Sequence, residues 1–150
     1  MASHYAALQG RFMLALDIQH VRMKQHATDK AQALQCLVDI LVEDQLVTPD
    51  YIHGLTAREQ QSATYLGQGI AIPHGTPQSR QCILKTGIRL AHFPEGVVWD
   101  GENKIYLAVV IAAKSDEHLQ VLQILTRALI NDVADQVKQA QSAEQIISLL

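Results

Sequence analysis

The residues with the clearest chemical potential in this 150-residue chain are two histidines and one arginine. His74 lies in the tripeptide Pro73-His74-Gly75, directly after the apolar segment 69–72. A strand ending at this proline places the His74 imidazole at a carboxyl strand end, where open α/β sheets bind their ligands. Neutral imidazole is a nucleophile near pH 7. His74 is therefore a candidate for covalent catalysis, with a simple turn histidine as the alternative.

His118 and Arg58 are the two side chains that could assist such a nucleophile. His118 occupies the third position of a helix if Ser115 is its N-cap, and unpaired N–H groups at that end of a helix favour an anion. Arg58 falls near the end of another expected helix. Its guanidinium could complement the helix dipole there, or it could hold a phosphoryl group through two oxygens. A structural role is the alternative for both residues.

The histidines also allow a metal hypothesis. His74, His118 and His92 could be zinc ligands in a metal-dependent hydrolase, since imidazole binds zinc. They are widely spaced, however, and form no compact ligand motif. We interpret the other four histidines as structural or solvent-exposed: His4, His20, His26 and His53.

Composition and charge limit the class of protein. Twelve Lys and Arg residues against 15 Asp and Glu residues give a net charge of −3, which offers no basic stripe for a nucleic acid. Cys36 and Cys82 form no CxxC motif and are expected to be buried, unpaired thiols. No signal peptide is visible, and the apolar run 105–113 is about half of the ~20 residues that a membrane helix requires. We expect a cytoplasmic protein without membrane insertion.

Helical periodicity and capping signals predict five helices. Apolar residues recur at helical spacing after Thr28 and Asp29, and Thr48-Pro49-Asp50 has the order typical of a helix start. Asp132 and Ser142 are expected to open two short helices, the second with Gln145 completing a capping box. The three longer helices are expected at residues 29–46, from 48–50 to about 59, and 116–130.

Strand signals alternate with these helices. The segment 105–112 is uniformly apolar and is expected to be a central strand, whereas 18–23 alternates and is expected at an edge. Pro94-Glu95-Gly96 should break the sheet. The remaining strands are expected at 69–72, 83–93 and 97–99. This order predicts a single α/β domain over residues 1–150, with a mixed, mostly parallel sheet of about five strands flanked by helices.

Four blocks in this order carry a family resemblance: Arg58-Glu59, Thr64-Tyr65-Leu66-Gly67, Ile70-Ala71-Ile72-Pro73-His74-Gly75-Thr76, and Asp116-Glu117-His118-Leu119-Gln120-Val121. Together they resemble the enzyme IIA domain of the mannitol and fructose class of the bacterial sugar phosphotransferase system. The resemblance covers nearly the whole chain. The segment Phe93-Pro94-Glu95-Gly96-Val97 is similar to the mannitol branch.

The resemblance implies that the protein is a phosphohistidine carrier. It maps the phosphoryl-accepting histidine of the family onto His74, which would receive the group from the histidine phosphocarrier protein and pass it to a cysteine of a IIB domain. It maps the histidine that positions the first one and the phosphoryl group onto His118, and the arginine that stabilises the phosphoryl group onto Arg58. No cofactor and no metal are implied.

The resemblance also implies a role in the uptake of a mannitol- or fructose-like sugar. A second function fits the same family. In its nitrogen-related branch the IIA protein is regulatory, and phosphorylation controls which targets it binds. Both functions would use the same histidine, His74.

Overall fold

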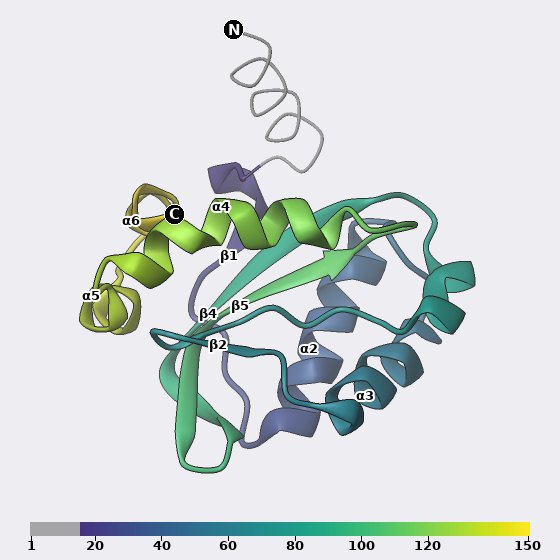
Figure 1. The fold of residues 1–150 in the computed structure, drawn as a ribbon, viewed down its shortest axis with the longest axis horizontal. Helices are drawn as coiled ribbons and strands as arrows, with labels where there is room; N and C mark the ends of the chain where they lie inside the picture. Colours follow the sequence, from purple (N-terminus) through teal and green to yellow (C-terminus); the bar gives the residue numbers. More distant parts are fainter. Residues whose placement is uncertain (1–15) are drawn as a thin grey trace, which may run out of the picture.

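The fold is a mixed β-sheet with helices on both faces, seen in a computed structural model that describes residues 16–150 (Figure 1). The sheet has five strands in the order β1-β4-β5-β3-β2. The strands are β1 (Val21–Arg22), β2 (Tyr65–Gly67), β3 (Ile70–Ala71), β4 (Gly87–Asp100) and β5 (Asn103–Ala112). The five-stranded mixed sheet flanked by helices is confirmed.

The pairing divides equally between the two orientations. β1 pairs with β4, and β3 with β5, in parallel, whereas β4–β5 and β2–β3 are antiparallel. The antiparallel ladder of β4 and β5 is the longest in the sheet because a two-residue turn joins these strands. In that turn Gly101 has a φ of +60°, which glycine adopts without strain. The sheet is therefore mixed without being mostly parallel.

Two hydrophobic cores lie on the opposite faces of the sheet. Successive side chains of a strand point to opposite faces. On β5, Ala108 and Val110 therefore belong to the core under helices α2 (Lys30–Glu43) and α3 (Tyr51–Gln61), while Val109 and Ile111 belong to the other core. That second core is covered by α4 (His118–Ile130), α5 (Ala134–Gln139) and α6 (Ala143–Leu149). Burial on both faces explains why the sequence of β5 is apolar throughout.

All five predicted helices are present, with small shifts of their ends. Asp29 caps α2 by accepting a hydrogen bond from the Gln32 N–H at 2.8 Å, and Ser142 caps α6 through the Gln145 N–H at 3.2 Å. The Gln145 side chain bonds the N–H of Gln141 rather than that of Ser142, so the predicted capping box is displaced by one residue. The N-cap of α5 is Val133 instead of Asp132, one residue later than expected.

Three strand predictions need correction. Residues 18–20 form the 3-10 turn η1 (Ile18–His20), so the predicted edge strand is only Val21–Arg22. β4 begins at Gly87 instead of residue 83. It also continues through residues 94–96, because a register shift between His92 and Val97 accommodates the proline as a bulge. β2 was not among the predicted strands.

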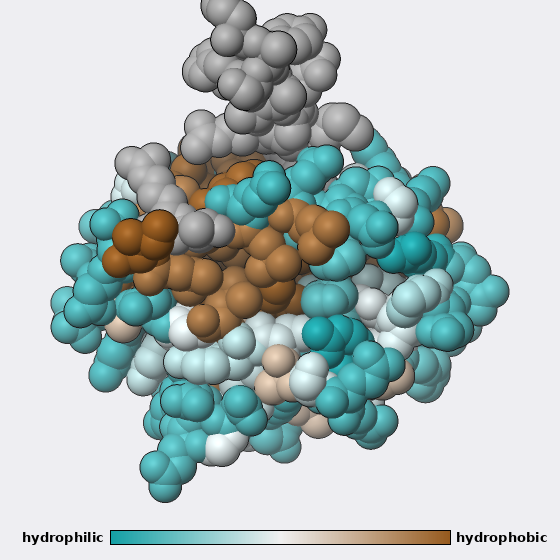
Figure 2. Space-filling view, viewed as in Figure 1, coloured by the Kyte–Doolittle hydropathy of each residue, from teal (hydrophilic) through white to brown (hydrophobic). Residues whose placement is uncertain are grey.

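Apolar side chains gather over the face of the molecule that carries α4, as Figure 2 shows. Leu119 is 52% and Ile130 78% exposed on this helix, and Leu122 is half-buried.

Among the described residues no helix combines the length and the apolar character that a bilayer crossing needs. Cys36 and Cys82 are free, as expected, but they are half-buried and not buried.

Candidate functional site

A pocket of about 260 Å³ brings the three candidate residues together. It lies between the C-terminal part of α3, the end of β3 and the start of α4. Its walls include the three candidates and, among others, three further polar side chains: Arg58, His74, His118, Tyr51, Arg80 and Asp116. These residues come from four separate parts of the sequence, so the pocket is a product of the fold.

His74 lies where the sequence places it, at the carboxyl end of a strand. It follows β3 and forms a parallel bridge with Ile111 of β5, whose N–H donates to the carbonyl of Pro73 at 2.9 Å. Pro73 has no N–H of its own and ends the regular ladder. The imidazole therefore stands at the edge of a rigid sheet, half-buried, and faces the pocket.

The backbone after His74 is held by a buried hydroxyl. The N–H of Gly75 donates to the Tyr51 hydroxyl at 2.9 Å, and that hydroxyl donates to the carbonyl of Ile111 at 2.9 Å. Burial raises the pKa of Tyr51 to about 12, although the Gly75 N–H opposes the rise, so the hydroxyl stays protonated. A Cβ on Gly75 would lie 2.6 Å from the Tyr51 ring and would also strike Ser79. Gly75 is thus required by close packing within the chain.

The hydrogen bond of His74 fixes its tautomer. Nδ1 lies 2.9 Å from the carbonyl oxygen of Ile72. Because a carbonyl only accepts, Nδ1 carries the proton and Nε2 carries the lone pair. Burial lowers the pKa of His74, and Arg58 and His118 lower it further, against the opposing effect of the Ile72 carbonyl. His74 is therefore a neutral imidazole with a nucleophilic Nε2 at pH 7.

His118 stacks on His74. The ring centroids are 5.0 Å apart and the ring planes differ by 12°. His118 is the first residue of α4 rather than the third, because Ser115 does not cap this helix. Instead the Glu117 carboxylate accepts the N–H of Ser115 at 2.8 Å, which leaves Ser115 in the preceding loop. The positive end of α4 still adjoins the pocket.

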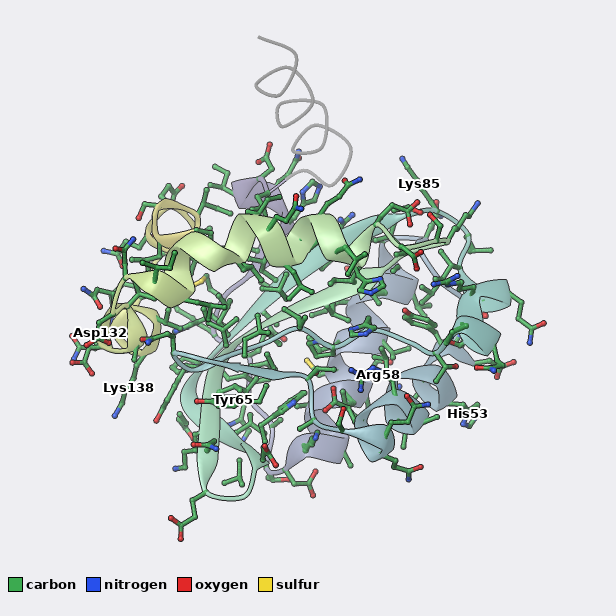
Figure 3. All side chains as sticks on the ribbon, viewed as in Figure 1. His53, Arg58, Tyr65, Lys85, Asp132 and Lys138 are labelled. Carbon is green, nitrogen blue, oxygen red and sulfur yellow. The ribbon has the colours of Figure 1, made fainter. Side chains whose placement is uncertain are left out.

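Arg58 lies where either of the two roles that the sequence allows is sterically open to it. It lies in the last turn of α3, as Figure 3 shows, and its Nη1 donates to the carbonyl of Ser62 at 2.7 Å. This contact satisfies a carbonyl at the end of the helix. Arg58 also lines the pocket and lowers the pKa of His74, so its positive potential reaches the imidazole.

The zinc triad is contradicted by the position of His92. This side chain is fully buried, and its Nε2 donates to the carbonyl of Val137 at 2.7 Å. His92 pairs with Leu107 on β5, whereas His74 bridges Ile111, roughly 13 Å further along at about 3.3 Å per residue. No three His, Cys, Asp or Glu side chains among residues 16–150 form a group that could hold a metal ion.

The other histidines lie away from the pocket or outside the described residues. His26 is exposed and lies 3.4 Å from Glu95, and His53 is exposed on α3 and points outward (Figure 3). His20 is half-buried in η1, and His4 lies outside the described residues. None of the three described ones lines the pocket with His74.

Two charged side chains of the pocket were missed by sequence reasoning. Arg80, from the 3-10 turn η2 (Pro77–Cys82), donates from Nη2 to Oδ1 of Asp116 at 3.1 Å. Asp116 falls at an expected helix start and within a motif block, but neither predicts a role for its side chain. Neither residue has a local signal for a site, because the two meet only in the folded chain.

Similar proteins point to one family. A family model described as phosphoenolpyruvate-dependent sugar phosphotransferase system, EIIA 2, matches residues 15–150. The multiphosphoryl transfer protein of Vibrio cholerae is 45% identical over 139 residues, which are 92% of this chain and 35% of that protein. The mannitol-specific EIICBA component of Pasteurella multocida is 40% identical over 128 residues, 83% of this chain and 20% of that protein. The chain thus spans about a third or less of the length of these relatives.

A solved structure of a related protein has a similar fold. It is a complex of mannitol enzyme IIA and phosphorylated mannitol enzyme IIB from Escherichia coli, with a TM-score of 0.81 and 32% identity. The similarity covers 91% of this chain and 96% of that chain. Since the family model matches residues 15–150, this chain belongs to the EIIA type 2 family of the phosphoenolpyruvate-dependent sugar phosphotransferase system, whose EIIA domains are phosphotransferases.

Proposed function

We propose that the protein is a phosphohistidine carrier. His74 accepts a phosphoryl group from the phosphorylated histidine phosphocarrier protein and passes it to a cysteine of a cognate IIB domain, in the uptake of a mannitol- or fructose-like sugar. The observation that carries this proposal is the fixed tautomer of His74, whose Nε2 lone pair faces a pocket lined by Arg58 and His118.

The reaction needs a nucleophile, positioning and positive potential. Nε2 of His74 forms a bond to phosphorus while the bond from phosphorus to the donor's histidine nitrogen breaks. Charge spreads over the three equatorial oxygens in the transition state. Arg58 and the positive end of α4 can stabilise that charge, and the stacked ring of His118 holds the His74 imidazole in place. No step passes through a metal ion.

Both protein partners must reach the same pocket. Leu119 follows the pocket residue His118, and Leu84 follows the pocket residue Ile83. Leu119 is 52% and Leu84 55% exposed. We place the docking surface for the donor and for the IIB acceptor on these apolar side chains around the pocket. Transient partners of this kind bury a modest area, which allows each to leave after transfer.

Intact-mass analysis tests the proposal directly. The protein is incubated with phosphoenolpyruvate, enzyme I and the histidine phosphocarrier protein, beside the variants His74→Ala and His118→Ala. We expect an acid-labile gain of one phosphoryl group that His74→Ala abolishes and His118→Ala retains at least in part. No gain in the wild type, with the upstream proteins active on another acceptor, would overturn the proposal.

A second experiment separates transport from regulation. The phosphorylated protein is mixed with a mannitol-type IIB domain, and loss of the phosphoryl group from His74 is followed by mass. Transfer to the IIB cysteine supports the transport function. A protein that is phosphorylated but discharges to no IIB domain would instead support the regulatory function within the same family.

A further inference from the structure

Arg80 and Asp116 form an ion pair beside the two stacked histidines. Both residues line the pocket, and the Arg80 Nη2 lies 3.1 Å from Oδ1 of Asp116. We propose that Arg80 is a second guanidinium ligand of the phosphoryl group on His74, and that Asp116 restrains Arg80 until the group arrives. This inference rests on the proposed function and adds to it a residue pair that sets how tightly the phosphoryl group is held.

Each partner lies close in sequence to one of the two histidines. Arg80 lies in η2, which starts three residues after His74, and Asp116 lies two residues before His118. η2 is anchored by Ser79, which is buried and whose hydroxyl donates to the Thr76 carbonyl at 2.7 Å. The backbone of Arg80 is therefore fixed next to the His74 turn, while its long side chain can change partners.

The ion pair is weak enough for Arg80 to exchange Asp116 for another partner. The side chains of Arg80 and Asp116 are 37% and 74% exposed, and one nitrogen–oxygen contact joins them. Exposed pairs of this kind contribute little stability. A phosphoryl group on histidine offers three oxygens and up to two negative charges, and a guanidinium can engage two such oxygens at once. Arg80 would therefore leave Asp116 for the phosphoryl group.

The charges of the pocket fit this exchange. Arg58 and Arg80 together match a phosphoryl dianion, whereas Asp116 cancels one of them in the unmodified protein. The positive charge of Arg80 also acts on Tyr51 and Glu117, where it works to lower the pKa of each side chain. Glu117 is itself engaged by the N–H of Ser115, so Asp116 is the acid that competes for Arg80 through a direct contact.

A phosphoryl carrier needs this competition for Arg80 because it must also release the phosphoryl group. If Arg80 bound the phosphoryl group without a competitor, transfer to the next protein would have to break the full interaction. Asp116 offers Arg80 an alternative partner and lowers the cost of release. No proton or electron moves in this exchange; the only covalent events are the formation and cleavage of the phosphorus–nitrogen bond at His74.

The test is the equilibrium constant for phosphoryl exchange with the histidine phosphocarrier protein, measured by intact mass on the full chain at several donor ratios. We expect Arg80→Gln to lower this constant about tenfold, as for one lost charged hydrogen-bonding partner, and Asp116→Asn to raise it about threefold or more. The double variant should match Arg80→Gln alone, because Asp116 acts through Arg80. Arg80→Lys should keep part of the effect.

A charge-matched control is Lys85→Gln, which removes an exposed cation outside the pocket lining (Figure 3). It should leave the equilibrium constant unchanged. If the wild type is phosphorylated but Arg80→Gln behaves like Lys85→Gln, the role of Arg80 is wrong. If Asp116→Asn lowers the constant, the restraining role of Asp116 is wrong. A wild type that takes up no phosphoryl group contradicts the proposed function itself.

Discussion

At the scale of single residues, the chemistry of the site depends on which nitrogen of His74 carries the proton. The Ile72 carbonyl holds the proton on Nδ1, and burial beside Arg58 lowers the pKa of His74 below its ordinary value of 6.5. We predict that long-range proton–nitrogen NMR shows an Nδ1–H tautomer and a titration below pH 6.5. Arg58→Gln should raise the pKa of His74, whereas Lys85→Gln should leave that pKa unchanged.

The sign of this shift connects phosphoryl transfer and stability. Because the folded state binds its proton less readily than the unfolded chain, the free energy of unfolding falls as the pH drops through the unfolded pKa of about 6.5 towards the folded value. Over the same interval His74 stays unprotonated and able to accept a phosphoryl group. A titration above pH 6.5, or an Nε2–H tautomer, would contradict the proposed nucleophile.

Tyr51 is the residue that we expect to fix the His74 turn. Tyr51→Phe leaves both the Gly75 N–H and the Ile111 carbonyl without their partner. A buried polar group left unpaired costs about 1–3 kcal/mol, so we predict a loss of about 2 kcal/mol in the free energy of unfolding. Urea unfolding measures this loss. Tyr65→Phe, on the half-buried strand β2, is the control and should change stability by less than about 0.5 kcal/mol.

The residues of the site differ in how far sequence could reveal them. His74 follows a strand and a proline, and the motif blocks around Arg58 and His118 carry a family resemblance, so all three are visible before folding. Tyr51 looks like an ordinary aromatic at a helix start. Arg80 and Asp116 pair across 36 positions of sequence, and no local pattern reports a contact of that range.

At the scale of elements, prediction succeeded where one periodicity was sustained. α2 repeats apolar residues over 14 positions, and β5 is buried on both faces over most of its length. β2 has only three residues, all half-buried, and therefore lacks the alternation that identifies a strand. β4 continues past Pro94 because a bulge accommodates the proline, which has no N–H to donate. The pattern of side chains does not reveal this bulge.

The junction between α3 and β2 tests how an element positions the site. Glu59 is buried, forms an ion pair with Lys30 at 2.8 Å, and accepts hydrogen bonds from the N–H and hydroxyl of Thr64. Glu59 thereby fixes the segment containing Ser62, whose carbonyl holds Arg58. Losing one partner of a buried pair costs about 3–5 kcal/mol. Because Lys30 is partly exposed, we predict about 2 kcal/mol for Glu59→Ala.

The matched control for this prediction is Glu95→Ala, which removes an exposed contact with His26. It should change the free energy of unfolding by less than about 0.5 kcal/mol. Glu59→Ala should also slow phosphorylation of His74 under conditions where the variant remains folded, because Arg58 loses its fixed anchor. Equal effects of the two substitutions on unfolding would show that the buried network does not hold this junction.

At the scale of the whole molecule, the sheet serves as a platform with the site at one end. β3 and β5 run parallel side by side, so the His74 turn and the loop before His118 both follow carboxyl strand ends at the same edge. The two cores hold α3 on one face and α4 on the other, and the pocket forms where their ends meet at that edge. A site on this platform with an apolar surface beside it would suit the successive docking of the two protein partners that the proposed function requires.

The position of that docking surface can be tested on α4 alone. Leu119 lies beside the pocket, whereas Ile130 lies at the other end of the helix, roughly 16 Å away at about 1.5 Å per residue. We predict that Leu119→Lys raises the KM for the phosphorylated histidine phosphocarrier protein about tenfold, with little change in kcat, because it removes a contact without altering the reacting groups. Ile130→Lys should leave both constants unchanged. If Ile130→Lys raises the KM and Leu119→Lys does not, the partners do not dock on the pocket end of α4, and the apolar surface near Ile130 becomes the stronger candidate.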